Sequence, residues 1–188
     1  MWVCARNAHL KFLPQNICNK PAGFCNVRWS TLYVMIEYSV RPIGFVTNSR
    51  KSIVDDHWGE IISTIKLDLD VLEESALDGL NTFSHVEIIY LFDQVANEKV
   101  STGSRHLRNN NNWPLVGILA QRAKDRVNRL GLTTCTIESV GTNSINVLGL
   151  DAIDGTPVLD IKPFMREFGP RGTVKQPEWA TELMRQYW

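Results

Sequence analysis

Several features that would assign a function class directly are missing from this 188-residue sequence. Its most apolar run, Val86–Phe92, is broken by Glu87, so no stretch approaches the roughly 18 apolar residues that a membrane-spanning helix requires. The four cysteines form no CxxC pair, which argues against a zinc site and against a disulfide-stapled fold. Neither a GxGxxG nor a P-loop motif is present. These absences favour one globular domain in a reducing, cytoplasmic setting, with no metal and no membrane partner.

Acidic residues are absent from residues 1–34, which contain Arg6, Lys11, Lys20 and Arg28. The remainder has 16 basic against 20 acidic residues, a net charge of −4. We therefore expect residues 1–34 to be a basic leader outside the fold. Two origins are possible: a targeting peptide, or upstream sequence translated from a start codon set before Met35. The second is favoured, because the leader has little serine and few arginines for an amphipathic import helix.

A second imbalance of charge lies inside the expected domain. Between Arg105 and Arg129 there are six basic residues and one acid, whereas the rest of the domain has 10 basic and 19 acidic residues. An acidic chain that concentrates its cations in two nearby loops is suited to receive an anion there. The alternative is a solvated basic loop without a partner.

The pattern of apolar residues predicts a mainly β protein. Seven segments alternate or run apolar with β-branched enrichment and are separated by turn formers: Ile36–Val46, Glu60–Leu67, His85–Phe92, Leu115–Gln121, Leu132–Val140, Ser144–Leu150 and Pro157–Phe164. Gly141-Thr142-Asn143 joins two of them at hairpin distance. Helical spacing predicts a short middle helix over Leu69–Leu80 and a C-terminal helix that begins at Pro177 and presents Trp179, Leu183 and Tyr187 on one stripe. We expect a barrel or sandwich whose apolar C-terminal helix is covered by the barrel or by a second subunit, with Trp179 and Trp188 as packing residues.

Four short motifs occur in a fixed order along the chain. They are Arg41-Pro42-Ile43-Gly44-Phe45-Val46, the strand entry Phe83-Ser84-His85, the Arg/Asn/Gly loop of residues 121–131, and above all residues 151–163, Asp-Ala-Ile-Asp-Gly-Thr-Pro-Val-Leu-Asp-Ile-Lys-Pro. From Met35 onward the sequence resembles the TsaA-like (TrmO, YaeB) family of S-adenosylmethionine-dependent tRNA methyltransferases. The resemblance implies that residues 35–188 form a small β-barrel of about seven strands, and that two copies form a homodimer with the S-adenosylmethionine site near their interface. It also implies methylation of N6 of threonylcarbamoyladenosine beside the tRNA anticodon.

Carried over by position, the resemblance implies cofactor contacts at His57, Trp58, Gly59, Asp93, Gln94, Arg122, Leu132, Asp151, Ala152, Ile153 and Asp154. These residue types suit the ligand. Asp151 or Asp154 can accept from ribose hydroxyls or the amino group, and Arg122 can hold a carboxylate or a phosphate. Trp58 can stack on adenine or face the sulfonium.

Catalysis and tRNA binding leave alternatives open. Methyl transfer needs alignment more than a strong base; the candidate catalytic residues are Asp160, His85 and Asn128. A histidine at a strand start, such as His85, is more often a satisfied histidine of the core than a catalyst. Asp160 is equally well explained as the ion-pair partner of Lys162. The expected contacts to tRNA phosphates are Arg105, Arg108, Lys124, Arg126 and Arg129.

The loop of residues 121–131 departs from the family pattern, because it keeps both arginines, the asparagine and the glycine but has no proline. Loss of proline predicts a looser loop. Three functions are therefore considered: a tRNA N6-methyltransferase, a methyltransferase of the same fold with another acceptor, and a non-catalytic module that binds S-adenosylmethionine.

Overall fold

The computed structural model describes residues 38–188. The chain divides into the units Met1–Tyr38 and Ser39–Trp188, and the fold is that of the second unit. The expected leader, residues 1–34, lies outside the described residues. Within the described range, no helix combines the length and the apolar character needed to cross a bilayer.

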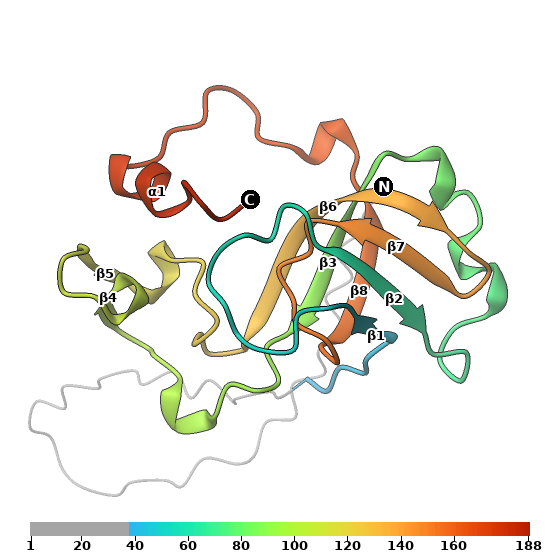
Figure 1. The fold of residues 1–188 in the computed structure, drawn as a ribbon, viewed down its shortest axis with the longest axis horizontal. Helices are drawn as coiled ribbons and strands as arrows, with labels where there is room; N and C mark the ends of the chain where they lie inside the picture. The colour runs from blue at the N-terminus through green and yellow to red at the C-terminus, as the bar shows by residue number, and fades with distance from the viewer. Residues whose placement is uncertain (1–37) are drawn as a thin grey trace, which may run out of the picture. The chain divides into compact units, whose positions relative to one another are not determined.

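Six of the eight strands of the second unit close into an antiparallel barrel in the order β1-β2-β7-β6-β3-β8 (Figure 1). The remaining two, β4 and β5, form a separate hairpin. The strand bounds are β1 Gly44–Thr47, β2 Ile62–Leu67, β3 His85–Leu91, β4 Ser104–His106, β5 Leu115–Gly117, β6 Leu130–Val140, β7 Ser144–Leu148 and β8 Pro157–Pro163. The prediction of a small, mainly β barrel is confirmed.

Buried and exposed residues alternate along the strands, so each strand presents one apolar face to the interior of the barrel. Val86, Ile88 and Tyr90 of β3 point inward and are almost fully buried, while the residues between them are partly exposed. The facing positions Ile145 and Val147 on β7 complete the same core. The predicted turn at residues 141–143 joins β6 to β7, whose register pairs Val140 with Ile145.

The predicted middle helix is wrong. In its place are two short 3-10 helices, Glu74–Leu77 and Leu80–Thr82, separated at Gly79, whose φ of 82° interrupts helical geometry. Leu77 is buried, but Leu69 is 44% exposed, so the apolar spacing was not that of one continuous face. Four further 3-10 helices span Asn97–Lys99, Leu107–Asn109, Ile118–Ala120 and Arg166–Phe168.

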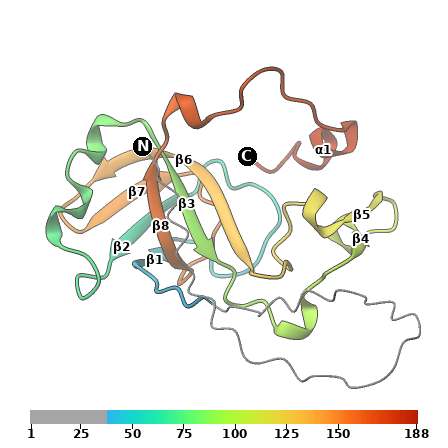
Figure 2. The same cartoon turned by 180° about the vertical axis from the view of Figure 1, so that it is seen from behind.

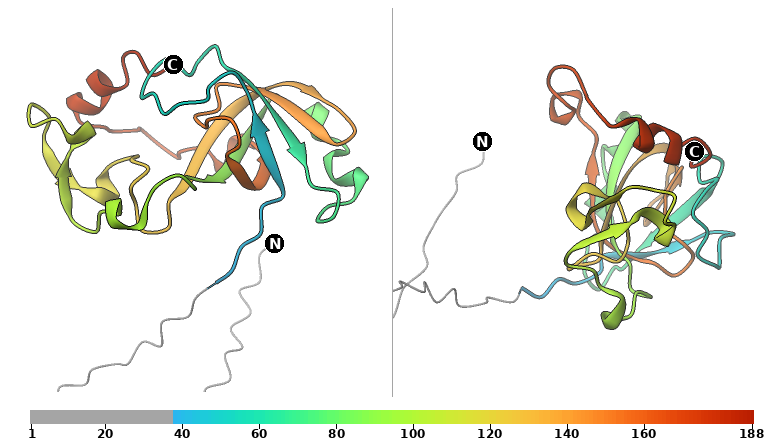
Figure 3. Two further views of the ribbon diagram at one scale, coloured as in Figure 1. Left: turned by 60° about the horizontal axis from the view of Figure 1, so that its bottom comes forward. Right: turned by 90° about the vertical axis from the view of Figure 1, so that its left-hand side faces the viewer.

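Other boundaries also differ from the predictions. The first strand is short, β1, since Pro42 supplies no amide for a ladder, and β4 was not predicted at all. The C-terminal helix α1 spans only Glu178–Leu183, so Tyr187 lies beyond its end. The β4–β5 hairpin and α1 lie at the same end of the barrel in every view (Figures 1, 2 and 3).

Candidate functional site

The main cleft of the second unit has a volume of about 800 Å³ and lies where the barrel, the β4–β5 hairpin region and the C-terminal segment meet. Its walls come from six stretches of chain that are distant in sequence. The lining residues are Ile53–Asp55 and Trp58; Phe92–Val95; Leu107–Asn109; Ala120–Lys124 with Thr133 and Thr134; Asp151–Ile153 with Thr156; and Gln176, Trp179, Ala180, Leu183, Met184, Tyr187 and Trp188.

Asp151 is one of three aspartates that line the cleft, with Asp55 and Asp93. Gly149, with a φ of 82°, turns the chain out of β7, and the buried neighbours Leu150 and Ala152 anchor the loop on either side. The side-chain amide of Asn48 donates to the Ala152 carbonyl at 2.8 Å, which fixes the loop further. The Asp151 carboxylate therefore stands at a defined position at the end of the barrel.

Burial raises the pKa of Asp151 to about 6, although the Tyr187 hydroxyl, Arg122 and Lys124 each favour its charged form. Tyr187 donates its hydroxyl hydrogen bond to Oδ2 of Asp151. Burial also raises the pKa of the nearby Cys135 thiol to about 12, so this cysteine is a neutral core residue. Asp151 thus changes protonation close to neutral pH, which is typical of functional carboxylates.

Trp58 is one of the residues that line the cleft. The indole is only 3% exposed, and the Arg50 guanidinium lies over its ring at 4.8 Å from the centroid. Its Nε1–H is buried and has no hydrogen-bond partner among residues 38–188. A buried donor without a partner beside a cleft is suited to donate to a ligand. Because Arg50 covers one face of the Trp58 ring, a ligand ring could stack only on the other face.

The loop that holds Trp58 is tied to the β4–β5 hairpin region by Arg108, which pairs with Asp56 and, at 4.0 Å, with Asp55. Arg108 donates twice to Asp56, at 2.8 and 2.6 Å, in a forked geometry. This pairing holds the pKa of the Asp56 carboxyl below its usual range and raises that of Arg108. Two walls of the cleft are therefore joined by charge.

Seven of the eleven cofactor residues expected from the resemblance line the cleft: Trp58, Asp93, Gln94, Arg122, Asp151, Ala152 and Ile153. The other four lie outside its lining. Asp154 faces the loop after β1, where it accepts from the Asn48 amide at 3.1 Å and pairs with Lys51 at 2.6 Å. The Leu132 carbonyl accepts a hydrogen bond from Arg122.

His57 and Gly59 flank Trp58, and the structure explains both by the path of the backbone. His57 has a φ of 63°, a conformation uncommon for a residue with a side chain. A Cβ on Gly59 would lie 2.6 Å from the Trp188 carbonyl carbon, so only glycine lets the C-terminal segment pass.

The three candidate catalytic residues lie outside the cleft. Asp160 forms an ion pair with Lys162 on the outer side of β8. His85, at the start of β3, has Ser84 Oγ at 2.8 Å from Nδ1 and Thr136 Oγ1 at 3.4 Å from Nε2. Asn128 is exposed in the loop before β6.

The five expected tRNA contacts divide into two groups. Arg105 and Arg108 are paired with carboxylates, Arg105 with Asp125 at 2.5 Å. Lys124 lines the cleft. The other two cations, Arg126 and Arg129, donate to the carbonyls of Gln121 and Val95, and neither has a carboxylate of the described residues within 4 Å.

The wall that the C-terminal segment forms along the cleft was not predicted from the sequence. The stripe Trp179, Leu183 and Tyr187 was recognised as an apolar face in need of a cover, and these residues line the cleft. Trp188, expected to be a packing residue, is 58% exposed and also borders it. The spacing of these apolar residues can be read from the sequence, but only the three-dimensional structure shows that they line the cleft.

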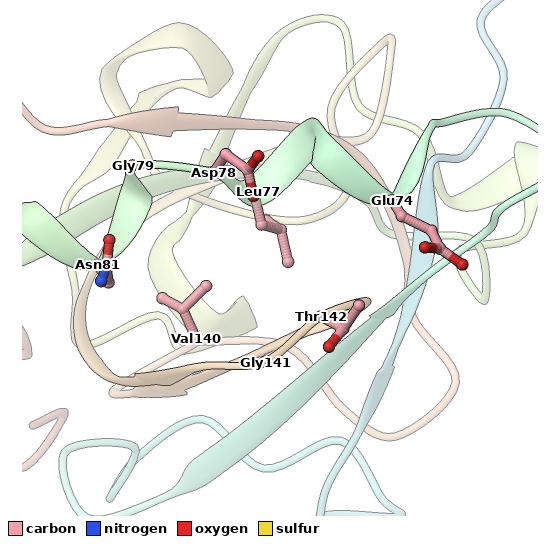
Figure 4. Close-up of a pocket in the computed structure, with 8 residues that line it drawn as sticks. All are labelled: Glu74, Leu77, Asp78, Gly79, Asn81, Val140, Gly141 and Thr142. Carbon is pink, nitrogen blue, oxygen red and sulfur yellow. The ribbon is translucent and has the colours of Figure 1, made fainter.

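A second hollow, of about 420 Å³, lies at the β6–β7 turn beside the 3-10 helices (Figure 4). Its lining contains Glu74 and Asp78 but no cation and no buried polar side chain without a partner. Residues 38–188 also contain no group of three or more His, Cys, Asp or Glu side chains placed to share a metal ion. The larger cleft is therefore the candidate site.

This combination defines a class: a small antiparallel barrel with a ligand cleft at one end. Residues 54–169 match the family described as tRNA-methyltransferase O N-terminal domain. The chain is 36% identical over 104 residues to the human tRNA (adenine(37)-N6)-methyltransferase, covering 55% of this chain and 23% of that protein. It is 32% identical over 143 residues to a "Probable S-adenosyl-L-methionine-binding protein" of Methanothermobacter thermautotrophicus, covering 73% of this chain and 97% of that one.

Solved structures agree. The fold is similar to a crystal structure of TrmO at 27% identity with a TM-score of 0.61, covering 75% of this chain and 64% of that one. It is also similar to TrmO from Pseudomonas aeruginosa at 26% identity with a TM-score of 0.60, covering 74% and 62%. The chain therefore belongs to the tRNA-methyltransferase O N-terminal domain family, and it spans about a quarter of the length of the human relative.

Proposed function

We propose that this protein is an S-adenosylmethionine-dependent tRNA methyltransferase that acts on N6 of threonylcarbamoyladenosine beside the anticodon. The observation that carries the proposal is the convergence of Asp151, Arg122 and the unpaired Trp58 N–H on one cleft of a chain of this family. The names of relatives support it, since they include a tRNA (adenine(37)-N6)-methyltransferase and a "Probable S-adenosyl-L-methionine-binding protein".

The residues of the cleft fit the groups that S-adenosylmethionine presents. Asp151 is suited to accept from ribose hydroxyls or from the ammonium group, and Arg122 to bind the carboxylate. The buried Trp58 N–H is suited to donate to a ring nitrogen or a carboxylate oxygen. The volume of about 800 Å³ is that of a typical cofactor site.

Bound S-adenosylmethionine supplies an activated methyl group. The residues of this chain contribute binding, orientation and exclusion of water, and these effects can account for most of the acceleration of an in-line displacement. Asp160 and His85 lie outside the cleft, so we propose that alignment, and not a strong base from either residue, drives the reaction.

The RNA is proposed to approach over Lys124, Arg126 and Arg129, which form no ion pair with another residue of the described range 38–188. We further propose a homodimer. Leu130 and Leu132 on the outer face of β6 are 44% and 43% exposed and lie opposite Leu91 and Ile89 of β3, which makes a continuous apolar strip for a second copy. A cytoplasmic location follows from the proposed substrate.

Calorimetry of the full chain with S-adenosylmethionine tests the cofactor site. Micromolar binding is expected, with loss of at least tenfold in Asp151→Ala and Arg122→Ala, because each variant removes a charged partner of the ligand. Asp160→Ala is the matched control, since it removes a carboxylate outside the cleft. Absence of heat with a folded wild-type chain refutes the proposal.

Mass spectrometry of tRNA incubated with the chain and S-adenosylmethionine tests the acceptor. A gain of one methyl group on threonylcarbamoyladenosine is expected. If Lys124, Arg126 and Arg129 contact phosphates, log K should fall against log salt with a slope of about −2, because single strands give about −0.7 per phosphate. Cofactor binding without any methylated nucleoside would instead favour the non-catalytic alternative, and a methylated product of another kind would favour another acceptor.

A further inference from the structure

The C-terminal segment, Gln176–Trp188, lies beyond the family match at residues 54–169 but forms a complete wall of the cleft. Residues 170–175, which connect it to the barrel, are all exposed. The segment therefore docks on the cleft as a separate piece of chain, and its contacts decide whether the cleft is covered.

Its contacts with the body are few and specific. The His57 amide donates to the Gln186 carbonyl at 2.8 Å, and the Trp58 amide donates to the Tyr187 carbonyl at 2.7 Å. Arg108 adds a long hydrogen bond to the Leu183 carbonyl at 3.4 Å. These bonds dock the segment against the same loop that carries the unpaired Trp58 N–H.

Tyr187 of the C-terminal segment reaches the Asp151 carboxylate. The Tyr187 hydroxyl donates to Asp151, and the Tyr187 ring packs edge-on against Trp188 with centroids 5.0 Å apart. We propose that Tyr187 is a positioning residue of the cofactor site: it orients the Asp151 carboxylate while the C-terminal segment closes the cleft over the ligand. The inference rests on the proposed function and adds to it a residue outside the family match.

The charge environment of Asp151 makes this role measurable. The titratable groups that act on it or are acted on by it are Tyr187, Tyr90, Cys135, Arg122, Lys124 and Asp55. The Tyr187 hydrogen bond favours the charged carboxylate, against the effect of burial. Without the hydroxyl, Asp151 is expected to hold its proton to higher pH.

The first test needs no ligand. The carboxyl carbon of Asp151 is titrated by NMR in the full chain, in Tyr187→Phe, and in Gln186→Ala. Tyr187→Phe removes one oxygen and keeps the ring, whereas Gln186→Ala changes an exposed side chain in the same segment and keeps the backbone bond to His57. The titration midpoint should rise in Tyr187→Phe and stay unchanged in the control. An equal midpoint in all three proteins overturns the proposal.

The second test follows the affinity for S-adenosylmethionine from pH 5 to 8.5. If the carboxylate form binds, affinity falls about tenfold per pH unit below the Asp151 pKa, and in Tyr187→Phe this fall begins at higher pH. A purely structural role would weaken binding by one factor at every pH, which would count against positioning. If the wild-type chain does not bind at all, the proposed function fails while the ligand-free titration still decides the role of Tyr187.

The hydrogen-exchange rates of the His57 and Trp58 amides report whether the C-terminal segment is docked, because both amides donate to it. The exchange rates of the barrel amides show in the same experiment whether a variant is folded. In Asp151→Asn these two amides should exchange faster, because the partner of Tyr187 is weakened, while amides of the barrel strands keep their protection. Unchanged exchange in this variant would mean that Asp151 does not hold the segment, and the closure part of the proposal would be abandoned.

Discussion

Gly131→Ala should destabilise the barrel through one contact that the structure defines. A Cβ at Gly131 would lie 2.3 Å from Cε2 and Cζ of Tyr90 and 2.8 Å from its Cδ2. Carbon atoms pack at roughly 3.5–4.0 Å, so the ring would have to move by about 1 Å or more. Tyr90 is 1% exposed, packs edge-on against Phe92 at 5.2 Å, and its hydroxyl lies 3.2 Å from Thr133 Oγ1.

A ring held on three sides cannot move freely, so we expect the cost of overpacking, about 1–3 kcal/mol in the free energy of unfolding. Urea denaturation followed by near-ultraviolet circular dichroism measures this difference. Gly103→Ala is the matched control, because a Cβ there meets nothing within 4 Å and its φ is ordinary. Its unfolding midpoint should match that of the wild type.

A double-mutant cycle separates this contact from a general effect of alanine. Tyr90→Leu removes the ring atoms that clash, so Gly131→Ala should cost little in that background, and the coupling energy should approach the single-mutant cost. Additive effects, or a stable Gly131→Ala single variant, would show that the close approach of Gly131 to Tyr90 does not explain the glycine at this position of β6.

Three further outcomes follow from the polar contacts. Arg108→Ala and Asp56→Ala should be coupled by about 0.5–1 kcal/mol in unfolding experiments, since the pair is bidentate but partly exposed; additive effects would mean that the ion pair does not stabilise the fold. Lys51 and the Asn48 amide hold the pKa of Asp154 below its ordinary value, so its stabilisation is present above about pH 4 and is lost as pH falls; the difference between wild type and Asp154→Asn should shrink in acid denaturation. Asp160→Asn should leave methylation unchanged, because Asp160 lies outside the cleft with Lys162, and a large loss in a steady-state assay would restore it as a catalytic candidate.

Most barrel strands could be predicted from the sequence because one face of each is buried. The alternation of β3 and β7 is read directly from their apolar residues, and the turn at residues 141–143 makes β6 and β7 neighbours. Segments without such a two-faced environment were not predictable. The residues after β2 carry leucines at helical spacing, but they form two short 3-10 helices separated at Gly79. Leu69, the first of these leucines, is exposed and lies outside both helices.

The candidate site was predictable only where a motif carried it. Residues 151–153 reach the cleft as the motif implied, but Asp154 of the same motif turns toward Lys51. Periodicity cannot say which of two acids in a loop faces inward, because that depends on Asn48, which is more than 100 residues away in sequence. Tyr187 could not be assigned for a related reason: its partner Asp151 comes from another strand end.

The loop of residues 121–131 shows how a segment without prolines can still be held by hydrogen bonds and an ion pair. Each proline would have contributed about 0.4–1 kcal/mol by restricting the unfolded chain. Here the buried Gln121 side chain donates to the carbonyls of Arg105 and Val116 at 3.1 and 2.9 Å, and Asp125 pairs with Arg105. Bonds of this kind contribute about 0.5–1.5 kcal/mol each, which is enough to offset the missing prolines. The same network uses the charge of Arg105 inside the protein, so the proposed contacts to RNA phosphates are left to Lys124, Arg126 and Arg129, which form no ion pair within residues 38–188.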